Sequence, residues 1–463
     1  MTMATPASPT FAYSTETLQS LAQHVLHLAK ALGASDCSTE FSDGHGLSVS
    51  VRKGAVETIE HNRDKGMGVT IYLPAEAGQQ GYRRGHASSS DFSLDALKAT
   101  VQAAYDIARY TAVDDCAGLP EPESLQNSPH DLGLYTPWNI DATTAIQIAQ
   151  TTEAAAFATS KQIRNSDGAS VHAQHGHFIL ANSRGFMGGY PYSRHSIACA
   201  PIAQSGRNIM QRDDWYSSQR DPAKLAAPAA IGRYAAERAL ARLHARRLST
   251  RRVPVLFEAP LAAGLLGALT QALSGGALYR QSSFLLNSLG QQVLAPHLQV
   301  WDDPTLQGGM GSASFDDEGC RTARRQIIKD GVVAGYFLST YSGRKLGLPT
   351  TGNAGGAHNL SLTSTQTIPN DDLPAMLRKL GTGLFVTELM GQGVNYVTGD
   401  YSRGAFGYWV ENGVIQYPVE EITIASNLKT MLRDIVAVGA DYLTRGTKTT
   451  GSILIESMQV AGN

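Results

Sequence analysis

The chain has 463 residues, of which 42% are hydrophobic and 17% are charged, and it has a net charge of −2. This length predicts two or three domains, and this composition is typical of globular proteins with a large core. A charge so close to zero disfavours a nucleic-acid-binding surface, which usually shows a basic excess.

Cysteine usage and hydropathy indicate where the protein works. The four cysteines, Cys37, Cys116, Cys199 and Cys320, are far apart and form no Cys-x-x-Cys pair, which favours a reducing, cytoplasmic setting. Residues 1–14 lack a basic start and an apolar run, and no later segment approaches a membrane-spanning length of uninterrupted apolar residues. We therefore expect neither a signal peptide nor a membrane span.

The N-terminal region alternates helical and extended patterns. Residues 15–32 have the spacing of an amphipathic helix, and residues 47–73 contain short alternating strands with a turn at Lys53-Gly54. Ser93 is placed to cap a second helix that reaches about Ile107. A helix–strands–helix order predicts an α+β fold with helices on antiparallel strands.

Residues 114–132 hold three prolines and little apolar periodicity, which predicts an exposed connector that divides two subdomains. Further elements follow it: a helix at 141–160, strand-like runs at 169–181 and 186–204, and a helix at about 224–244. The basic stretch 238–252 has helical spacing, which favours a solvated helix face over a DNA contact. We predict an N-terminal α+β domain over 1–247 and a β-rich C-terminal domain over 248–463.

The segment Gly381–Gly413 has eight glycines in 33 residues, interleaved with Val, Tyr, Phe and Trp. Glycine weakens a strand, so its repeated use indicates bulges, bends or the close approach of another chain. We interpret the segment as a glycine-rich groove that fits an extended peptide. Tight hairpin turns without any ligand are the alternative.

Motifs for known catalytic chemistry are absent from the sequence. No histidine is followed by glutamate, so the H-E-x-x-H zinc motif cannot be built. In His172-x-x-His175-x-His177 the last two side chains share one face of a strand, but solvated imidazoles are favoured over a metal site, because no carboxylate or Cys lies nearby in the sequence. Ser402 lacks the Gly-x-Ser-x-Gly context of a nucleophile, so we interpret it as a turn residue.

Long, specific strings are spread from about Glu16 to Gly462. They include Asp106-Ile-Ala-Arg-Tyr-Thr, Gly275-Gly-Ala-Leu-Tyr-Arg, Tyr341-Ser-x-Arg-Lys-Leu-Gly-Leu, Thr387-Glu-Leu-Met-Gly-Gln-Gly-Val and Thr398-Gly-Asp-Tyr-Ser-Arg-Gly. These strings resemble the TldD/PmbA family, and specifically its PmbA branch, which is also called TldE.

The resemblance implies a cytoplasmic heterodimer of a TldD-like and a PmbA-like subunit that degrades short or unfolded peptides, with links to peptide maturation, antitoxin degradation and DNA gyrase modulation. The TldD-like subunit carries zinc or a similar divalent metal on an H-E-x-x-x-H helix that follows a strand like Val253–Phe257. Here the matching segment, Pro260–Leu273, has only Thr270 and Gln271 as polar residues. The resemblance therefore implies that this chain has no metal ligand and no catalytic residue of its own.

The physical interpretation and the resemblance coincide at the glycine-rich segment. A peptide bound as an added β-strand is held by main-chain hydrogen bonds, which suit substrates of any sequence. Gly391, Gly393 and Gly399 would permit close approach, while Asn395 and Thr398 would supply hydrogen bonds. The remaining candidates are Ser402 in the turn, and Arg403 or His358 facing carbonyl oxygens or the C-terminus of a substrate.

Two alternatives stay open at this point. The chain could be an autonomous metallopeptidase whose metal is held by a non-standard histidine site, with His172, His175 and His177 as candidates. It could instead be a homodimeric peptide- or protein-binding adaptor, such as a DNA gyrase modulator. A homodimer in isolation is compatible with the heterodimer, because a symmetric pair can use the same surface.

Overall fold

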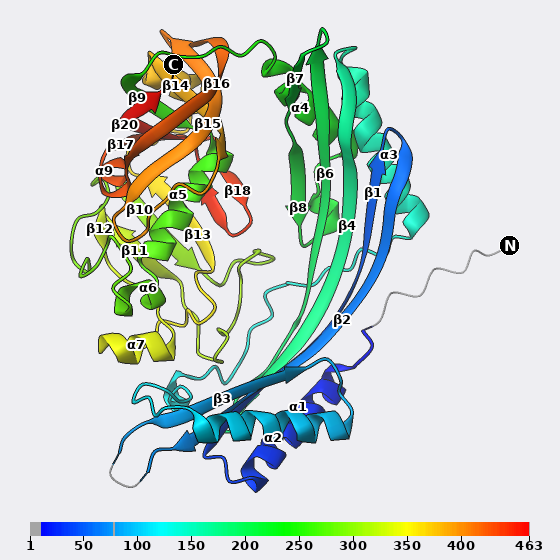
Figure 1. The fold of residues 1–463 in the computed structure, drawn as a ribbon, viewed down its shortest axis with the longest axis vertical. Coiled ribbons are helices and arrows are strands. Elements are labelled where there is room, and N and C mark those ends of the chain that lie inside the picture. The colour runs from blue at the N-terminus through cyan, green and yellow to red at the C-terminus, as the bar shows by residue number, and fades with distance from the viewer. Residues whose placement is uncertain (1–10, 77–78, 463) are drawn as a thin grey trace, which may run out of the picture. The chain divides into compact units, whose positions relative to one another are not determined.

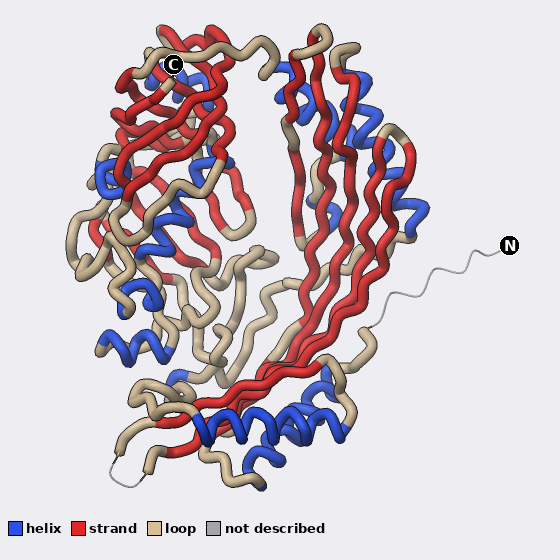
Figure 2. The backbone as a smooth tube through the Cα atoms, viewed as in Figure 1, coloured by secondary structure: helices blue, strands red, loops and turns tan. Residues whose placement is uncertain are grey.

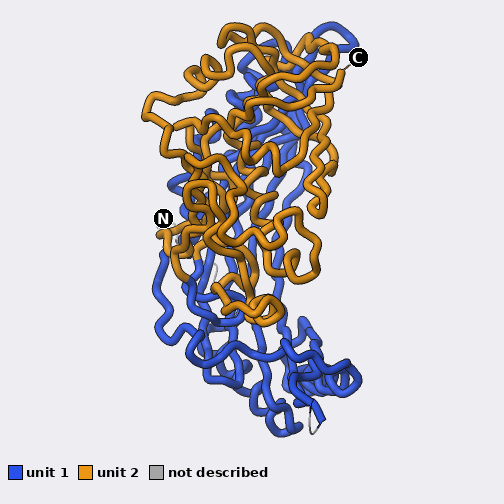
Figure 3. Tube along the Cα trace, turned by 90° about the vertical axis from the view of Figure 1, so that its left-hand side faces the viewer, with its two compact units in different colours: residues 1–240, 313–322 blue, residues 241–312, 323–463 orange. Residues whose placement is uncertain are grey.

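A computed structural model describes residues 11–76 and 79–462, which form two compact units (Figures 1 and 3). Of the described residues, the first unit comprises 11–76, 79–240 and 313–322, and the second comprises 241–312 and 323–462. The predicted domains, 1–247 and 248–463, stay a prediction. The expected absence of a signal peptide falls largely on residues 1–10, outside the described residues.

The first unit is built on one antiparallel sheet with the strand order β3-β2-β1-β4-β6-β7, with β5 beside β4 and β8 beside β6. Figure 2 draws the strands in red and the helices in blue. The strands are β1 (Asp36–Arg52), β2 (Ala55–Pro74), β3 (Tyr82–Ser89), β4 (Ile163–Asn182), β5 (Met187–Gly188), β6 (Pro191–Ser205), β7 (Ile209–Arg212) and β8 (Trp215–Gln219). Strands β1 and β4 pair continuously from Ser38 to Val51, although the segment 114–132 separates them in the sequence.

One face of this sheet carries the helices of the first unit. Helices α1 (Thr15–Ala31) and α2 (Leu94–Tyr110) share a core with the strands near one end of the sheet. Helix α3 (Ala142–Thr159) contacts β1, β4 and β6, and α4 (Pro228–Ala241) packs against it. Odd-numbered side chains of β1 are buried along most of the strand, so both groups of helices cover the same face.

The predicted helices agree with the structure, and the reason is local. The side chains of Ser14, Ser93 and Asp141 each accept a hydrogen bond from the backbone of the first turn of α1, α2 and α3. The fourth helix begins later than predicted, at Pro228, because Pro222–Lys224 forms a separate 3-10 turn (η2).

The expectation of an exposed connector at 114–132 is wrong for its apolar residues. Leu119, Leu125 and Leu132 are buried, and the segment contains a single 3-10 turn, Pro122–Ser124 (η1). Leu125 pairs with Cys320 of the segment 313–322 and joins a small core with Phe186. The leucines of 114–132 are therefore buried by a segment distant in the sequence, although the local composition predicts an exposed loop.

The second unit contains two six-stranded sheets. One has the order β12-β11-β10-β13-β19-β18 and the other β16-β15-β14-β9-β20-β17. The former consists of β10 (Leu298–Asp303), β11 (Arg325–Lys329), β12 (Val332–Val333), β13 (Asn359–Ser364), β18 (Leu443–Arg445) and β19 (Lys448–Thr450). The latter consists of β9 (Arg251–Phe257), β14 (Gly383–Met390), β15 (Asp400–Glu411), β16 (Val414–Asn427), β17 (Ile435–Val438) and β20 (Ile453–Ala461).

Helix α5 (Ala259–Ala272) follows β9 directly and contacts β14 of one sheet and β18 and β19 of the other. It is apolar nearly all round, as expected for a helix inside a core. The other helices of this unit are α6 (Gly275–Tyr279), α7 (Thr340–Leu346), α8 (Leu373–Leu380) and α9 (Leu428–Arg433).

The α+β fold class predicted from the sequence is confirmed, with antiparallel strands under helices in the first unit and two strand-rich layers in the second. Within the described ranges, no helix combines the length and the apolar character needed to cross a membrane.

Candidate functional site

The glycine-rich segment forms the β14–β15 hairpin and its connecting loop, residues 391–399. Gly391 and Gly399 have φ angles of +76° and +85°, where other residues are strained. A Cβ at Gly393 would lie 1.7 Å from the carbonyl oxygen of Ser402, whose N–H donates to the Gly393 oxygen at 2.7 Å. The close approach that these glycines permit is thus made by the two arms of the hairpin itself.

The polar candidates of this loop hydrogen-bond locally. The side-chain oxygen of Asn395 accepts from the N–H groups of Val397 (2.9 Å) and Thr398 (3.3 Å). The Thr398 hydroxyl donates to Asp400 at 2.7 Å, and Nε of Arg403 donates to the Met390 carbonyl oxygen at 3.1 Å. The loop is therefore ordered by its own side chains, and their roles toward a peptide stay predictions. The expectation of Ser402 in a turn is wrong, because Ser402 lies in β15 and pairs with Ala425 of β16.

His358 and the hairpin belong to different sheets of the second unit. His358 immediately precedes β13, whereas β14 and β15 are strands of the other sheet. It is buried, its N–H donates to Oδ1 of Asp302 at 2.8 Å, and its ring Nε2 bonds the Gly352 carbonyl oxygen at 2.9 Å. Asn353 donates to the other oxygen of Asp302 at 2.9 Å, and burial raises the pKa of Asp302. His358 does face a carbonyl oxygen, but one of its own chain.

The helix that would carry a metal is α5. It contains no histidine, cysteine or carboxylate between Ala259 and Ala272. The Thr270 hydroxyl donates to the Leu266 carbonyl oxygen at 2.8 Å, and Gln271 is exposed. These residues do not fit a divalent metal, which takes imidazole, thiolate or carboxylate ligands.

The histidines of β4 divide between the two faces of the sheet in the first unit. His175 and His177 share the helix-bearing face, whereas His172 points to the other face, where its Nδ1 shares a hydrogen bond of 2.9 Å with the Ser48 hydroxyl. The three histidines are therefore not brought together. His175 and His177 are also buried, so the expectation of solvated imidazoles is wrong for both.

Strand register gathers other groups around these two histidines. His45 of β1 is the direct partner of His175, Asp43 is the partner of His177, and His195 of β6 lies across from Ala173. The His177 Nε2 lies 3.6 Å from a carboxylate oxygen of Asp43. This cluster is not apparent from the sequence, because the Asp43 carboxylate and the imidazoles of His45 and His195 come from strands whose pairing cannot be deduced from local pattern.

Aromatic rings and hydrogen bonds order the imidazoles. The ring centroids of His45 and His175 are 4.8 Å apart, and those of His175 and His195 are 5.2 Å apart. The His195 Nε2–H donates to the Thr136 carbonyl oxygen at 2.9 Å, and Trp138 packs edge-on against the same ring. This bond fixes the tautomer of His195 and leaves Nδ1 as an acceptor.

Burial, aided by the neighbouring imidazoles of His195 and His45, lowers the pKa of His175 to about 4. Burial also lowers the pKa values of His45, His177 and His195. At neutral pH the imidazoles of this cluster are therefore uncharged. Four of their buried ring nitrogens have no hydrogen-bond partner among the described residues: Nε2 of His45, Nδ1 of His175, Nε2 of His177 and Nδ1 of His195.

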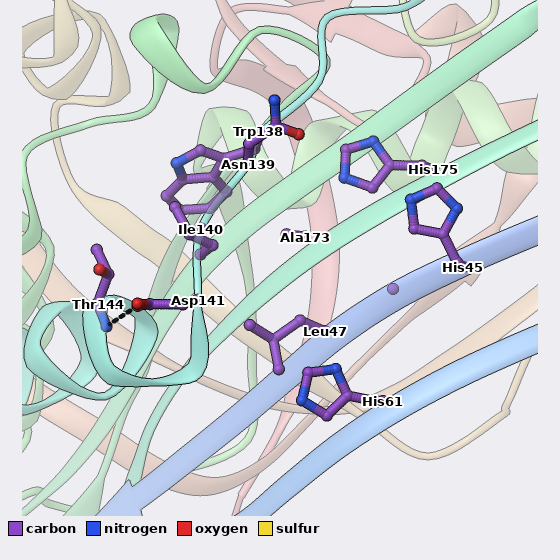
Figure 4. Close-up of a pocket in the computed structure, with 11 residues that line it drawn as sticks. His45, Leu47, His61, Trp138, Asn139, Ile140, Asp141, Thr144, Ala173 and His175 are labelled. Atoms are coloured by element: carbon purple, nitrogen blue, oxygen red, sulfur yellow. Dashed lines mark hydrogen bonds between the residues drawn. The ribbon is translucent and has the colours of Figure 1, made fainter. Parts of the chain in front are cut away.

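A pocket of about 330 Å³ opens beside His45 and His175 (Figure 4). Its walls are Leu47, His61, Ala173 and residues 138–141, with Thr144 at the start of α3. The Asp141 carboxylate accepts from the Thr144 N–H at 2.7 Å, so it is used to cap the helix. The pocket can bind a small polar or aromatic group through uncharged imidazoles and the Trp138 ring.

Groups that could converge on a metal lie elsewhere in the first unit. In the part of the chain that the structure describes, they are Asp114, Asp115 and Cys116, and Asp316, Glu318 and Cys320. The Asp316 carboxylate already accepts from the N–H groups of Glu318 and Cys320, at 3.0 and 2.9 Å, as in an ordinary turn. Neither set contains a histidine.

Family comparisons cover nearly the whole chain. The domains described as PmbA/TldA metallopeptidase domain 1, central domain and C-terminal domain match residues 39–108, 135–243 and 250–462. Metalloprotease PmbA of Escherichia coli O157:H7 is 46% identical over 436 residues, which cover 94% of each chain. A metalloprotease PmbA homolog of Haemophilus influenzae is 42% identical over 446 residues, which cover 96% of each chain. A metalloprotease TldD homolog from the same organism is 28% identical over 195 residues, which cover 40% of each chain.

Solved structures share the fold. A protein of Bacteroides thetaiotaomicron, described as a candidate modulator of DNA gyrase, superposes with a TM-score of 0.89 at 25% identity over 97% of this chain and 100% of its own. TldE of Thermococcus kodakarensis superposes with a TM-score of 0.81 at 17% identity, covering 96% of this chain and 100% of its own. The second likeness concerns the fold alone.

Proposed function

Because the chain belongs to the PmbA/TldD metallopeptidase family, we propose that it is the metal-free subunit of a cytoplasmic peptidase, paired with a TldD-like subunit. The TldD-like subunit carries zinc or a similar divalent metal and cleaves short or unfolded peptides, including peptides under maturation and antitoxins. This chain binds and orients the substrate.

The observation that carries the proposal is the composition of α5. The helix follows β9, where the resemblance implies that a TldD-like subunit has its ligands, yet in this chain it presents Ala, Leu and Gly. Its buried residues Leu265, Leu266 and Leu269 fill the core of the second unit. With apolar side chains in place of imidazole or carboxylate ligands, α5 packs into the core but cannot hold a metal ion.

The β14–β15 hairpin supports the substrate-binding role. Most of its loop is exposed, including Tyr396 and Val397, and Met390 at the end of β14 is exposed as well. Exposed apolar side chains beside main-chain groups suit an extended peptide of variable sequence. Because only an extended chain can bind in this way, folded proteins would not be cleaved.

Co-purification with a TldD-like subunit tests the proposal. We expect a stable pair with metal in proportion to the TldD-like subunit, and cleavage of an unfolded peptide by the pair but not by this chain alone. Gln271→Ala, on the exposed side of α5, is the matched variant, and it should leave cleavage unchanged because Gln271 is not a ligand. Metal content and peptide cleavage are measured for both forms.

Several results would contradict this function. One is peptide cleavage by this chain alone that follows its own metal content, which would favour an autonomous metallopeptidase. Another is loss of cleavage in Gln271→Ala while pairing stays intact. A third is tight binding to DNA gyrase with no pairing to a TldD-like subunit, which would favour an adaptor.

A further inference from the structure

A second pocket lies in the second unit, beside the β14–β15 hairpin. It has a volume of about 230 Å³ and is lined by residues 284–288 and 291–293 together with Lys429 and Arg433. Phe284, Leu285 and Val293 are buried and form apolar walls. Two hydrogen bonds join this region to the hairpin loop: Phe284 N–H to the Tyr396 oxygen at 2.8 Å, and Leu428 N–H to the Gly399 oxygen at 2.6 Å.

Ser288 is the first sign that the pocket accepts a ligand. The residue is 4% exposed, and its hydroxyl has no hydrogen-bond partner among the described residues. A buried hydroxyl without a partner loses its hydrogen bonds to water and gains none in return, so such groups are rare unless something else satisfies them. Two backbone groups beside the hydroxyl are already paired, because the Ser288 carbonyl oxygen accepts from the Gln291 N–H at 2.8 Å and the Leu289 N–H donates to the Tyr336 hydroxyl at 2.9 Å.

Charge is the second sign. Lys429 and Arg433 are four residues apart on α9, so their side chains leave the same side of the helix. Arg433 donates to the Gln292 oxygen at 3.2 Å, which holds its guanidinium at the rim of the pocket. The residues that line the pocket include two cations and no aspartate or glutamate. The site is therefore complementary to an anion.

The surroundings indicate which anion. Leu286 and Leu289 are exposed on the loop that forms the pocket, and Tyr396 and Val397 are exposed on the adjoining hairpin. An extended chain lying along these apolar residues would reach the two cations at its end. An apolar cavity that ends in positive charge and a hydroxyl fits an aliphatic side chain with a terminal carboxylate.

We propose that this pocket binds the C-terminal residue of a peptide, with Lys429 and Arg433 pairing with the carboxylate, the Ser288 hydroxyl donating to it, and Phe284, Leu285 and Val293 surrounding an aliphatic side chain. The identification of the ligand as a peptide rests on the proposed function. The pocket anchors the end of the substrate while the rest of the chain extends along the hairpin.

Fluorescence anisotropy on the full-length chain without any partner tests this site. The probe is an unstructured decapeptide that ends in leucine, labelled at its N-terminus and compared as free acid and as C-terminal amide. We expect the acid to bind at least tenfold more tightly than the amide. The double variant Lys429→Gln with Arg433→Gln should abolish this difference, and Ser288→Ala should reduce it several-fold.

The matched control, Lys30→Gln with Lys98→Gln, removes the same charge from exposed helix positions of the first unit and should bind like the unmodified chain. Equal affinity for acid and amide would overturn the proposal. So would displacement of the acid by inorganic phosphate at the concentration of the peptide, or equal binding of an amidated peptide with an internal glutamate. If this chain does not bind the peptide but its pair with a TldD-like subunit still cleaves peptides, only the pocket proposal is refuted. If this chain binds the peptide but does not pair with a TldD-like subunit, only the proposed function is refuted.

Discussion

Imidazoles that cannot easily become charged occupy the middle of the first unit. His175 is 5% exposed and lies between His45 and His195, so a proton on its ring is disfavoured by burial and by the two neighbouring imidazoles. The position of these residues between the two groups of helices makes them part of the core as much as part of a pocket.

Acid should therefore weaken the first unit. The pKa of His175 is about 4 in the folded chain against 6.5 for the ordinary group, so the unfolded chain binds more protons between these values. The stabilisation is present above pH 6.5 and is lost as the pH falls toward 4, by on the order of 3 kcal/mol. Denaturant unfolding at several pH values, followed by tryptophan fluorescence, to which Trp138 and Trp215 of the first unit contribute, measures this loss.

The variant His175→Leu should show a shallower loss of stability over the same pH range, whatever its stability at neutral pH. His27→Leu removes an exposed histidine of α1 and serves as the control. An unchanged pH dependence in His175→Leu would contradict the assignment of the effect to this residue.

At the scale of elements, the β14–β15 hairpin uses glycine for two different reasons. Gly391 and Gly399 supply left-handed backbone at the two ends of the loop, whereas Gly393 supplies space against Ser402. These demands are steric and belong to the chain itself, so the hairpin is already shaped before any peptide arrives.

Gly393→Ala should destabilise the second unit by about 1–3 kcal/mol, because its Cβ would overlap the Ser402 oxygen and force the two arms apart. Gly264→Ala in α5 is the matched control, since a Cβ there meets nothing within 4 Å and alanine favours the helix. Thermal unfolding of both variants gives the comparison. A Gly393→Ala chain as stable as the unmodified one would contradict the crowding argument.

At the scale of the whole molecule, one sheet edge remains open in the first unit. Strand β3 pairs with residues 67–74 of β2, whereas residues 55–66 pair with β1 on one side and, within the described chain, with no strand on the other. This edge is exposed and carries Glu57, Glu60, Arg63, Asp64 and Lys65. Charged side chains on an open edge discourage pairing with another molecule.

Replacing the acidic pair by β-branched residues, Glu57→Val with Glu60→Val, should therefore promote self-association that rises with protein concentration. Glu57→Gln with Glu60→Gln keeps the edge polar and should associate much less. Sedimentation velocity over a range of concentrations distinguishes the two. Equal association of both variants would show that the edge is not protected by these charges.

Much of the fold was predictable from short-range pattern. Helix caps at Ser14, Ser93 and Asp141, the turn at Lys53-Gly54 and the alternating strands all depend on neighbours a few residues away, which the sequence displays directly. The glycines of 381–413 likewise indicated close backbone approach, whereas the helix α5 was expected only from the family resemblance. Family membership followed from long strings and needed no geometry.

Tertiary structure alone decided which distant residues meet. The register of β1 with β4 places His45 and Asp43 against His175 and His177, and the packing of 313–322 buries the leucines of the connector. The fold of the second unit likewise unites Ser288 with Lys429 and Arg433 in one pocket. Strand register and core packing sum weak contacts over the whole chain, so no local stretch of sequence contains enough information to specify them.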